Sequence, residues 1–171
     1  MKQNPLKTYR MENEEVQYTY VAAFIMAVTS KRWDRTNGDF IQTVDAICCS
    51  HWTEAVHEVA HWLAADPGCR GLDNLGLPKD DTGTDVWEEM SEVRRRMYRE
   101  EVVALAMTKP MCAAFGCDDR VGSYVDYLDE GRTVLCKKFG LDEGWARQRA
   151  SQLLAGIAGI LEEYAGLASG Q

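Results

Sequence analysis

One short stretch, Ser50 to Asp66, limits the possible folds of this chain of 171 residues more than any other part of the sequence. It reads SHWTEAVHEVAHWLAAD and contains all three histidines. His57 and His61 flank Glu58 in an HExxH pattern, and residues four apart share one face of an α-helix. A random arrangement of the same residues would give roughly 0.003 such patterns per chain. The stretch therefore predicts a helix that carries a metal site.

Each member of the pattern has an expected role. We expect His57 and His61 to bind the metal, and Glu58 to act as a catalytic base on a water molecule rather than as a ligand. The expected cofactor is one divalent metal, Zn or Fe(II), because histidine and carboxylate ligands suit both ions. The alternative is a structural histidine pair without a metal. His51 is rotated about 120° from His57 along a continuous helix, so we expect it outside the site unless the helix breaks near Ser50.

A third protein ligand is expected on the helix predicted after Asp85. At 100° per residue, the apolar residues of that segment centre on one face, and Glu101 falls about 20° from the centre, whereas Glu100 falls about 80° away. A carboxylate on a buried face needs a partner such as a cation. Glu101 is therefore predicted as the third ligand. Glu100 is the alternative ligand. The structural alternative is a glutamate that binds no metal and is either solvated or paired with an arginine.

Composition narrows the range of partners. The 27 acidic and 19 basic side chains give a net charge of -8, which argues against nucleic acid or an anionic membrane as the main partner. No signal-peptide core is present, and the apolar run 20–28 is too short to span a bilayer, so we expect a cytoplasmic protein. The six cysteines lack paired spacing and are expected to be reduced and mostly buried. The sequence carries no signal for an oligomeric state.

The fold is expected to be mainly α, with little or no β structure. Residues 1–171 are predicted to form a single metal-binding domain with flexible tails at 1–11 and 168–171. About five helices are predicted, over residues 12–29, 40–65 with a break near 50, 85–109, 120–139 and 142–167. The glycine-rich segment 67–84 is predicted to be a long functional loop, and short β pairing at 72–77 is the alternative for part of it.

Local signals set the expected helix boundaries. A turn at residues 37–39 is predicted to cap the second helix. Asp85 and Glu88 resemble a capping box at the beginning of the third helix, and Pro110 is expected to end that helix. Asp142 is predicted to cap the last one.

The metal-site stretch also resembles a known family. The run AVHEVAHWLAADPGCRGLDNLG is similar to the corresponding segment of the elongation factor P hydroxylase family, which has HExxHW followed by an arginine-containing stretch. The matching residues are His57, Glu58, His61, Trp62, Asn74, Leu75 and Gly76. The later run RVGSYVDYLDEGRTVLCKKFG is similar to the family's C-terminal helix, so the resemblance covers about residues 45 to 140.

This resemblance implies a metal-dependent hydroxylase that acts on a modified lysine of a translation factor. It implies His57 and His61 as ligands, Glu58 as a metal-site residue, and a glutamate near 100 or 101 as the remaining carboxylate. The chain departs from the family where EEVVALAM replaces a proline-glutamine-alanine segment, and where Leu77 and Pro78 replace an aromatic pair. We therefore expect this protein to keep the scaffold and the metal of the family but not its substrate.

Two other interpretations stay open. A minimal zinc metallopeptidase also has HExxH followed by a helix with ExxA, which Glu101 to Ala104 resembles, and in it Glu58 is the general base. Either enzyme would act on a protein or peptide substrate, but the sequence shows no edge strand to hold an extended peptide, which counts against the peptidase. A helical binding protein with a structural or degenerate metal site would instead use exposed tryptophans. The candidates are Trp33, Trp87 and Trp145.

Overall fold

Five α-helices and a small sheet form the part of the chain that the structure, a computed structural model, describes: residues 14–36, 38, 40–78, 83–116 and 119–170. The helices are α1 (Glu14–Thr29), α2 (Trp52–Ala64), α3 (Glu92–Ala114), α4 (Asp119–Phe139) and α5 (Glu143–Ala168). The strands are β1 (Arg32–Asp34), β2 (Ile41–Gln42) and β3 (Ala46–Cys48). Three 3-10 helices follow α2, namely η1 (Pro67–Cys69), η2 (Asp73–Gly76) and η3 (Trp87–Glu89). The predicted mainly α fold is confirmed.

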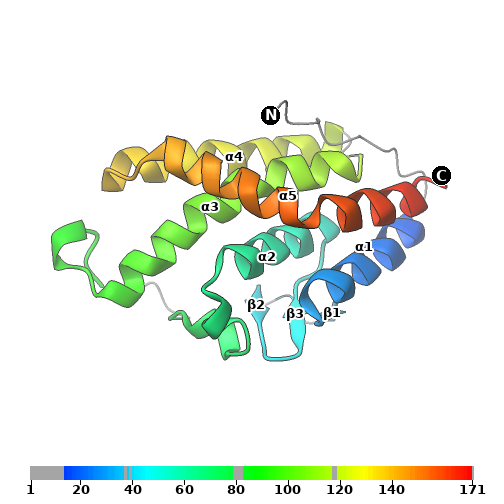
Figure 1. Cartoon of the computed structure of the whole chain (residues 1–171), viewed down its shortest axis with the longest axis horizontal. Coiled ribbons are helices and arrows are strands. Elements are labelled where there is room, and N and C mark those ends of the chain that lie inside the picture. The colour runs from blue at the N-terminus through cyan, green and yellow to red at the C-terminus, as the bar shows by residue number, and fades with distance from the viewer. Residues whose placement is uncertain (1–13, 37, 39, 79–82, 117–118, 171) are drawn as a thin grey trace.

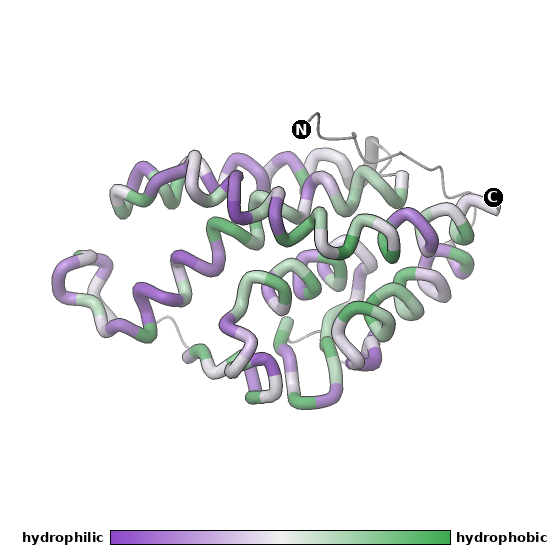
Figure 2. The backbone as a smooth tube through the Cα atoms, in the orientation of Figure 1, coloured by the Kyte–Doolittle hydropathy of each residue, from purple (hydrophilic) through white to green (hydrophobic). Residues whose placement is uncertain are grey.

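Helix α3 is central to the arrangement. Helices α2, α4 and α5 all pack against it, and α1 packs on α2 and α5 (Figure 1). The sheet lies on the other side of α1 and α2 from α4. Figure 2 shows that α3 is hydrophilic where it begins and becomes hydrophobic where it passes over α2. This change lets one helix carry both polar site residues and core residues.

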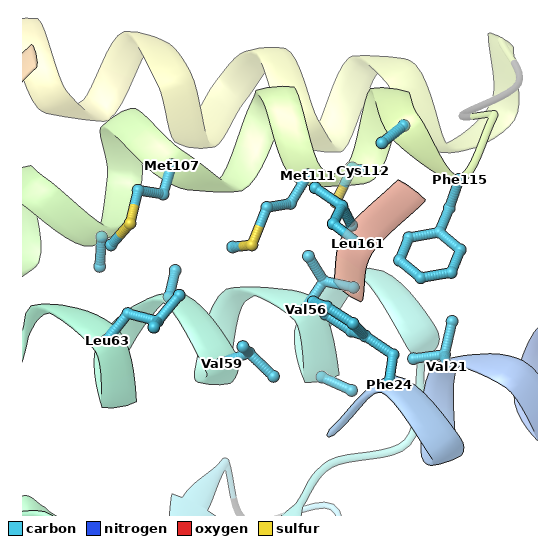
Figure 3. Close-up of a cluster of buried hydrophobic side chains, with 14 of the residues drawn as sticks. Val21, Phe24, Val56, Val59, Leu63, Met107, Met111, Cys112, Phe115 and Leu161 are labelled. Atoms are coloured by element: carbon cyan, nitrogen blue, oxygen red, sulfur yellow. The ribbon is translucent and has the colours of Figure 1, made fainter. Parts of the chain in front are cut away.

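One large apolar core joins the helices (Figure 3). Helix α2 contributes Val56, Val59 and Leu63, whose spacing of three and four residues gives the helix one continuous apolar side. Met107 and Met111 of α3 face this side, and both are fully buried. Packing of these side chains fixes α2 against α3, and with it the residues on the rest of α2.

The sheet replaces the first part of a predicted helix. Strand β3 is central, with β1 parallel to it on one side and β2 antiparallel on the other, so β2 is an edge strand. The helix predicted from residue 40 is therefore wrong as far as residue 50. All of β3 is buried, and a short apolar run of this kind fits a strand or a helix equally well by its spacing. Of the predicted turn at 37–39, residues 37 and 39 lie outside the described residues.

The boundaries of α3 also differ from the prediction. The helix begins at Glu92, with the Ser91 side chain accepting a hydrogen bond from the Arg94 amide. Asp85 does not cap it but forms ion pairs with Arg94 and Lys138. Pro110 does not end the helix, which continues to Ala114. The four residues from Met111 to Ala114 are buried or half-buried, and burial of apolar surface there offsets the backbone hydrogen bond that proline cannot make.

Other boundaries agree more closely. Asp142 caps α5 by accepting a hydrogen bond from the Trp145 amide, as predicted. Residues 73–76 form η2 instead of a β pairing. The predicted tail at 1–11 lies outside the described residues, and Ala168 of the other predicted tail is the last residue of α5.

Two further expectations concern the thiols and the membrane. The five described cysteines are thiols rather than disulfides, and all except Cys69 are buried. Burial is the main reason why the pKa of the Cys49 thiol is raised to about 12, so this thiol stays protonated. Among the described helices, none combines the length and apolar character needed to cross a bilayer.

The core predicts a contrast between two leucines of α5. Leu161 is fully buried, whereas Leu167 is 41% exposed. Leu161→Ala should lower the free energy of unfolding by about 2 to 5 kcal/mol, because it removes apolar contacts and leaves a cavity. Leu167→Ala is the matched control and should change it by less than about 0.5 kcal/mol. Urea denaturation followed by circular dichroism measures both, and equal effects would contradict this account of the core.

Candidate metal centre

Helix α2 begins with a capping box formed by His51 and Glu54. The His51 side chain accepts a hydrogen bond from the Thr53 amide, and the Glu54 carboxylate accepts one from the His51 amide. The break near Ser50 is thus present, but His51 is used as a cap. It lies outside the candidate ligand group, in agreement with the prediction.

The end of α2 is held by Arg70. Its guanidinium donates to the carbonyl oxygens of Trp62 and Leu63, at 2.9 and 3.0 Å, and lies 4.2 Å from the Trp62 ring centroid. These carbonyls have no amide partner within the helix, so the arginine satisfies them. The tryptophan and the arginine of the HExxHW resemblance therefore form one structural unit that closes the helix.

Three predicted ligands lie together. His57 and His61 approach each other with 3.1 Å between their Nε2 atoms, and Glu101 of α3 reaches both of them. Its Oε2 is 2.7 Å from His61 Nε2, and its Oε1 is 3.9 Å from His57 Nε2. These residues form the one group of candidate metal ligands found among the described residues. Side-chain exposures of 13%, 17% and 27% leave an opening to solvent on this group.

The dimensions of the group suit a small divalent ion. Ligand atoms around a tetrahedral zinc ion at roughly 2.0–2.1 Å stand about 3.3 Å apart. The three separations given above bracket this value, so small side-chain rotations would bring the atoms around one ion. Two imidazoles and one carboxylate form a ligand set for catalytic Zn and also for Fe(II), and both leave coordination positions open.

Thr108 sets the tautomer of the His57 ring. Its hydroxyl oxygen lies 2.7 Å from His57 Nδ1 and 2.9 Å from the Ala104 carbonyl. The hydroxyl has one hydrogen, which it donates to the carbonyl, so it accepts a hydrogen bond from Nδ1–H. The Nε2 lone pair of His57 then faces the ligand group. We did not predict Thr108 from the sequence, although its position seven residues after Glu101 puts both on one face of α3.

Charges within the group are strongly coupled. Burial and the neighbouring His61 lower the pKa of His57 to about 4, which keeps its ring neutral as a ligand must be. Burial acts in the same direction on His61, but the charge and hydrogen bond of Glu101 outweigh it and raise the pKa of His61 to about 9. Burial opposes ionisation of Glu101, but His61 lowers its pKa to about 2. At neutral pH these shifts favour an imidazolium–carboxylate pair of His61 and Glu101.

Glu58 does not belong to the ligand group but lies beside it on α2. Its Oε2 accepts a hydrogen bond of 3.0 Å from Gln42 Nε2. Burial, the largest influence, raises the pKa of Glu58. This is the position expected for a base that is not a ligand. No sequence signal identified Gln42, because it lies in the segment that was predicted as helix.

Glu100, the alternative ligand, points elsewhere. It is buried, with its Oε1 3.6 Å from Arg96 Nε and accepting a hydrogen bond of 3.4 Å from the Asp66 amide. Its Oε2 is buried and has no hydrogen-bond partner among the described residues. Glu100 thus connects α3 to the segment after α2, whereas Glu101 faces the histidines.

The remaining candidates have structural surroundings. Trp33 stacks on Tyr18 and donates to the Cys49 carbonyl, and Trp87 packs on Phe139. Trp145 alone of the three candidate tryptophans is exposed, at 43%.

Comparison with known proteins adds no relative. No protein-family model, curated protein or solved structure matches the chain.

The Thr108 contact predicts a change in metal affinity. Thr108→Val keeps the shape of the side chain but leaves His57 Nδ1–H without an acceptor, so zinc affinity should fall by about 10- to 100-fold. Thr108→Ser retains the hydroxyl and is the control. Competition with a chromophoric chelator measures the affinities, and identical values for both variants would contradict a role for the hydroxyl.

The two adjacent glutamates predict a second contrast. Glu101→Gln replaces an anionic ligand and should weaken zinc binding by more than about 100-fold, since outer partners alone contribute about 10- to 100-fold. Glu100→Gln, one residue away on the same helix, should leave zinc affinity close to that of the unmodified protein. The same chelator competition decides between them, and the reverse order would identify Glu100 as the ligand.

Proposed function

We propose that this protein is a metal-dependent hydrolase that cleaves amide bonds in a protein or peptide substrate. The observation that carries the proposal is the position of Glu58. It stands beside the His57, His61 and Glu101 group, with one carboxylate oxygen held by Gln42. A carboxylate in this place can accept a proton from water and pass it to a leaving amine.

The residues divide into two roles. His57, His61 and Glu101 would hold the ion, and a bound divalent ion would polarise the carbonyl group of the substrate and make water more acidic. Glu58 supplies the proton transfer. Its raised pKa favours this task, because a base works best when its pKa is close to the working pH.

The sheet gives the hydrolase interpretation additional support. The absence of a visible edge strand counted against a peptidase in the sequence, but β2 is an edge strand and its Gln42 contacts Glu58 directly. An extended peptide can pair with such an edge through main-chain hydrogen bonds. Because η2 packs against β2, a peptide would reach the strand only where η2 leaves the edge open.

A hydroxylase of the elongation factor P type is the second candidate. It is favoured by the contact of Arg70 with Trp62, since two residues of the resembling motif form one unit next to the ligands. In that case the ion would be Fe(II), for which two histidines and one carboxylate are equally suitable. For either reaction we propose the cytosol as the setting, where the cysteine thiols would stay reduced. A binding protein is less well supported, because Trp33 and Trp87 pack within the fold.

The proposal predicts that two substitutions separate metal binding from catalysis. His57→Ala should abolish binding of about one zinc per chain, measured by elemental mass spectrometry. Glu58→Gln should retain the zinc but lower the rate of peptide cleavage by about 100- to 10,000-fold, because it removes proton transfer. Mass spectrometry of a proteome-derived peptide library, incubated with the zinc-loaded protein, detects the new termini.

Several outcomes would change the assignment. New termini that persist at the same level with Glu58→Gln would show that Glu58 is not the base. Addition of one oxygen atom with Fe(II) and dioxygen, without any cleavage in zinc, would favour the hydroxylase. Lack of any bound metal after anaerobic purification and metal loading would contradict both enzymes.

A further inference from the structure

A chain of buried polar groups leads from the sheet to Glu58. Lys31, which lies between α1 and β1, is only 2% exposed. Its Nζ donates to Gln42 Oε1 at 3.3 Å and to the Thr43 carbonyl at 2.9 Å. Gln42, also 2% exposed, then donates from Nε2 to two oxygens of Glu58, the carbonyl at 2.6 Å and Oε2 at 3.0 Å.

Only one arrangement of donors and acceptors is possible along this series of hydrogen bonds. A lysine ammonium can only donate, so the Gln42 atom that faces Lys31 must be the amide oxygen. The NH₂ group of Gln42 therefore faces α2, and its two hydrogens serve the two Glu58 oxygens. The amide cannot rotate by 180° without placing its NH₂ group against the ammonium. Lys31 thus determines the orientation of Gln42, and Gln42 determines which Glu58 oxygen is occupied.

The surroundings of Lys31 are unusual for a purely structural lysine. A buried charge is costly unless it is paired. Lys31 makes no direct ion pair with a carboxylate among the described residues, and its two acceptors are an amide and a carbonyl. The carboxylate at the end of this chain of hydrogen bonds is Glu58, one amide away.

We propose that Gln42 and Lys31 are positioning residues for Glu58, which hold one of its carboxylate oxygens so that the other points to the reacting molecule. The inference rests on the role of Glu58 in the proposed function. Lys31 acts through Gln42, so the two should not contribute independently. Hydrogen bonds to charged groups of this kind orient active-site residues and are worth about a tenfold effect or more.

The test uses acetohydroxamic acid and the zinc-loaded full chain. This small molecule chelates a metal through two oxygens and carries a proton that a neighbouring carboxylate can accept, so its affinity reports the orientation of Glu58 without requiring turnover. Gln42→Met and Lys31→Met should each weaken its binding by about tenfold, while zinc content stays at the level of the unmodified protein. Isothermal titration calorimetry gives the affinities, and elemental analysis gives the zinc content.

Three variants serve as controls. Lys31→Arg keeps the donor and the charge and should restore most of the affinity that Lys31→Met loses. Lys137→Met replaces an exposed lysine of α4 and should have no effect. The double variant Lys31→Met/Gln42→Met should bind no more weakly than Gln42→Met alone, because Lys31 acts through Gln42.

The results separate this inference from the proposed reaction. Unchanged acetohydroxamate binding in Gln42→Met, or additive losses in the double variant, would overturn the inference. A loss of thermal stability with unchanged binding would also overturn it, since that is the result of a purely structural role. The expected binding losses without any peptide cleavage would support the positioning roles while removing hydrolysis as the function.

Discussion

The packing of α2 against α3 is the interaction on which the rest of this structure depends. Apolar side chains on one side of each helix bring the backbones together, and the polar residues nearby then meet across the same interface. His57 receives both its tautomer-setting partner, Thr108, and a neighbouring ligand, Glu101, from α3. Metal ligands held by two well-packed helices keep their geometry better than ligands on loops. The large apolar core is therefore also the support of the candidate site.

The local part of the site was readable from the sequence, and the part that depends on tertiary contacts was not. The spacing of His57 and His61 defines their geometry as soon as the segment is helical, and the capped helix satisfies that condition. The expected position of Glu101 on the buried face assumes a helix that begins at Val86. The helix begins at Glu92 instead. Val93, which the same assumption places on the buried face, is 45% exposed. The residue that lies beside the two histidines was thus predicted from partly incorrect premises.

Gln42 shows why the remainder could not be predicted. Its contact with Glu58 depends on the pairing of β2 with β3 and on the approach of the sheet to α2, which are contacts between segments that no periodicity encodes. Strands β2 and β3 are buried or half-buried, so their apolar residues lack the alternation that identifies a half-exposed strand. The edge strand changes the functional interpretation more than any other element that the sequence did not indicate. It provides a support for Glu58 through Gln42.

The capping box of α2 has a consequence for the way the site would fail. Helices unravel from their ends, and His57 lies one turn nearer to the capped end than His61 does. Loss of helical structure at His51 and Glu54 would therefore displace His57 before it displaced His61. An ion that bound only the intact pair would oppose this fraying in return, because any ligand specific for the ordered helix adds to its stability. The third histidine, although it lies outside the candidate ligand group, would thus contribute to metal binding through the order of the helix that it begins.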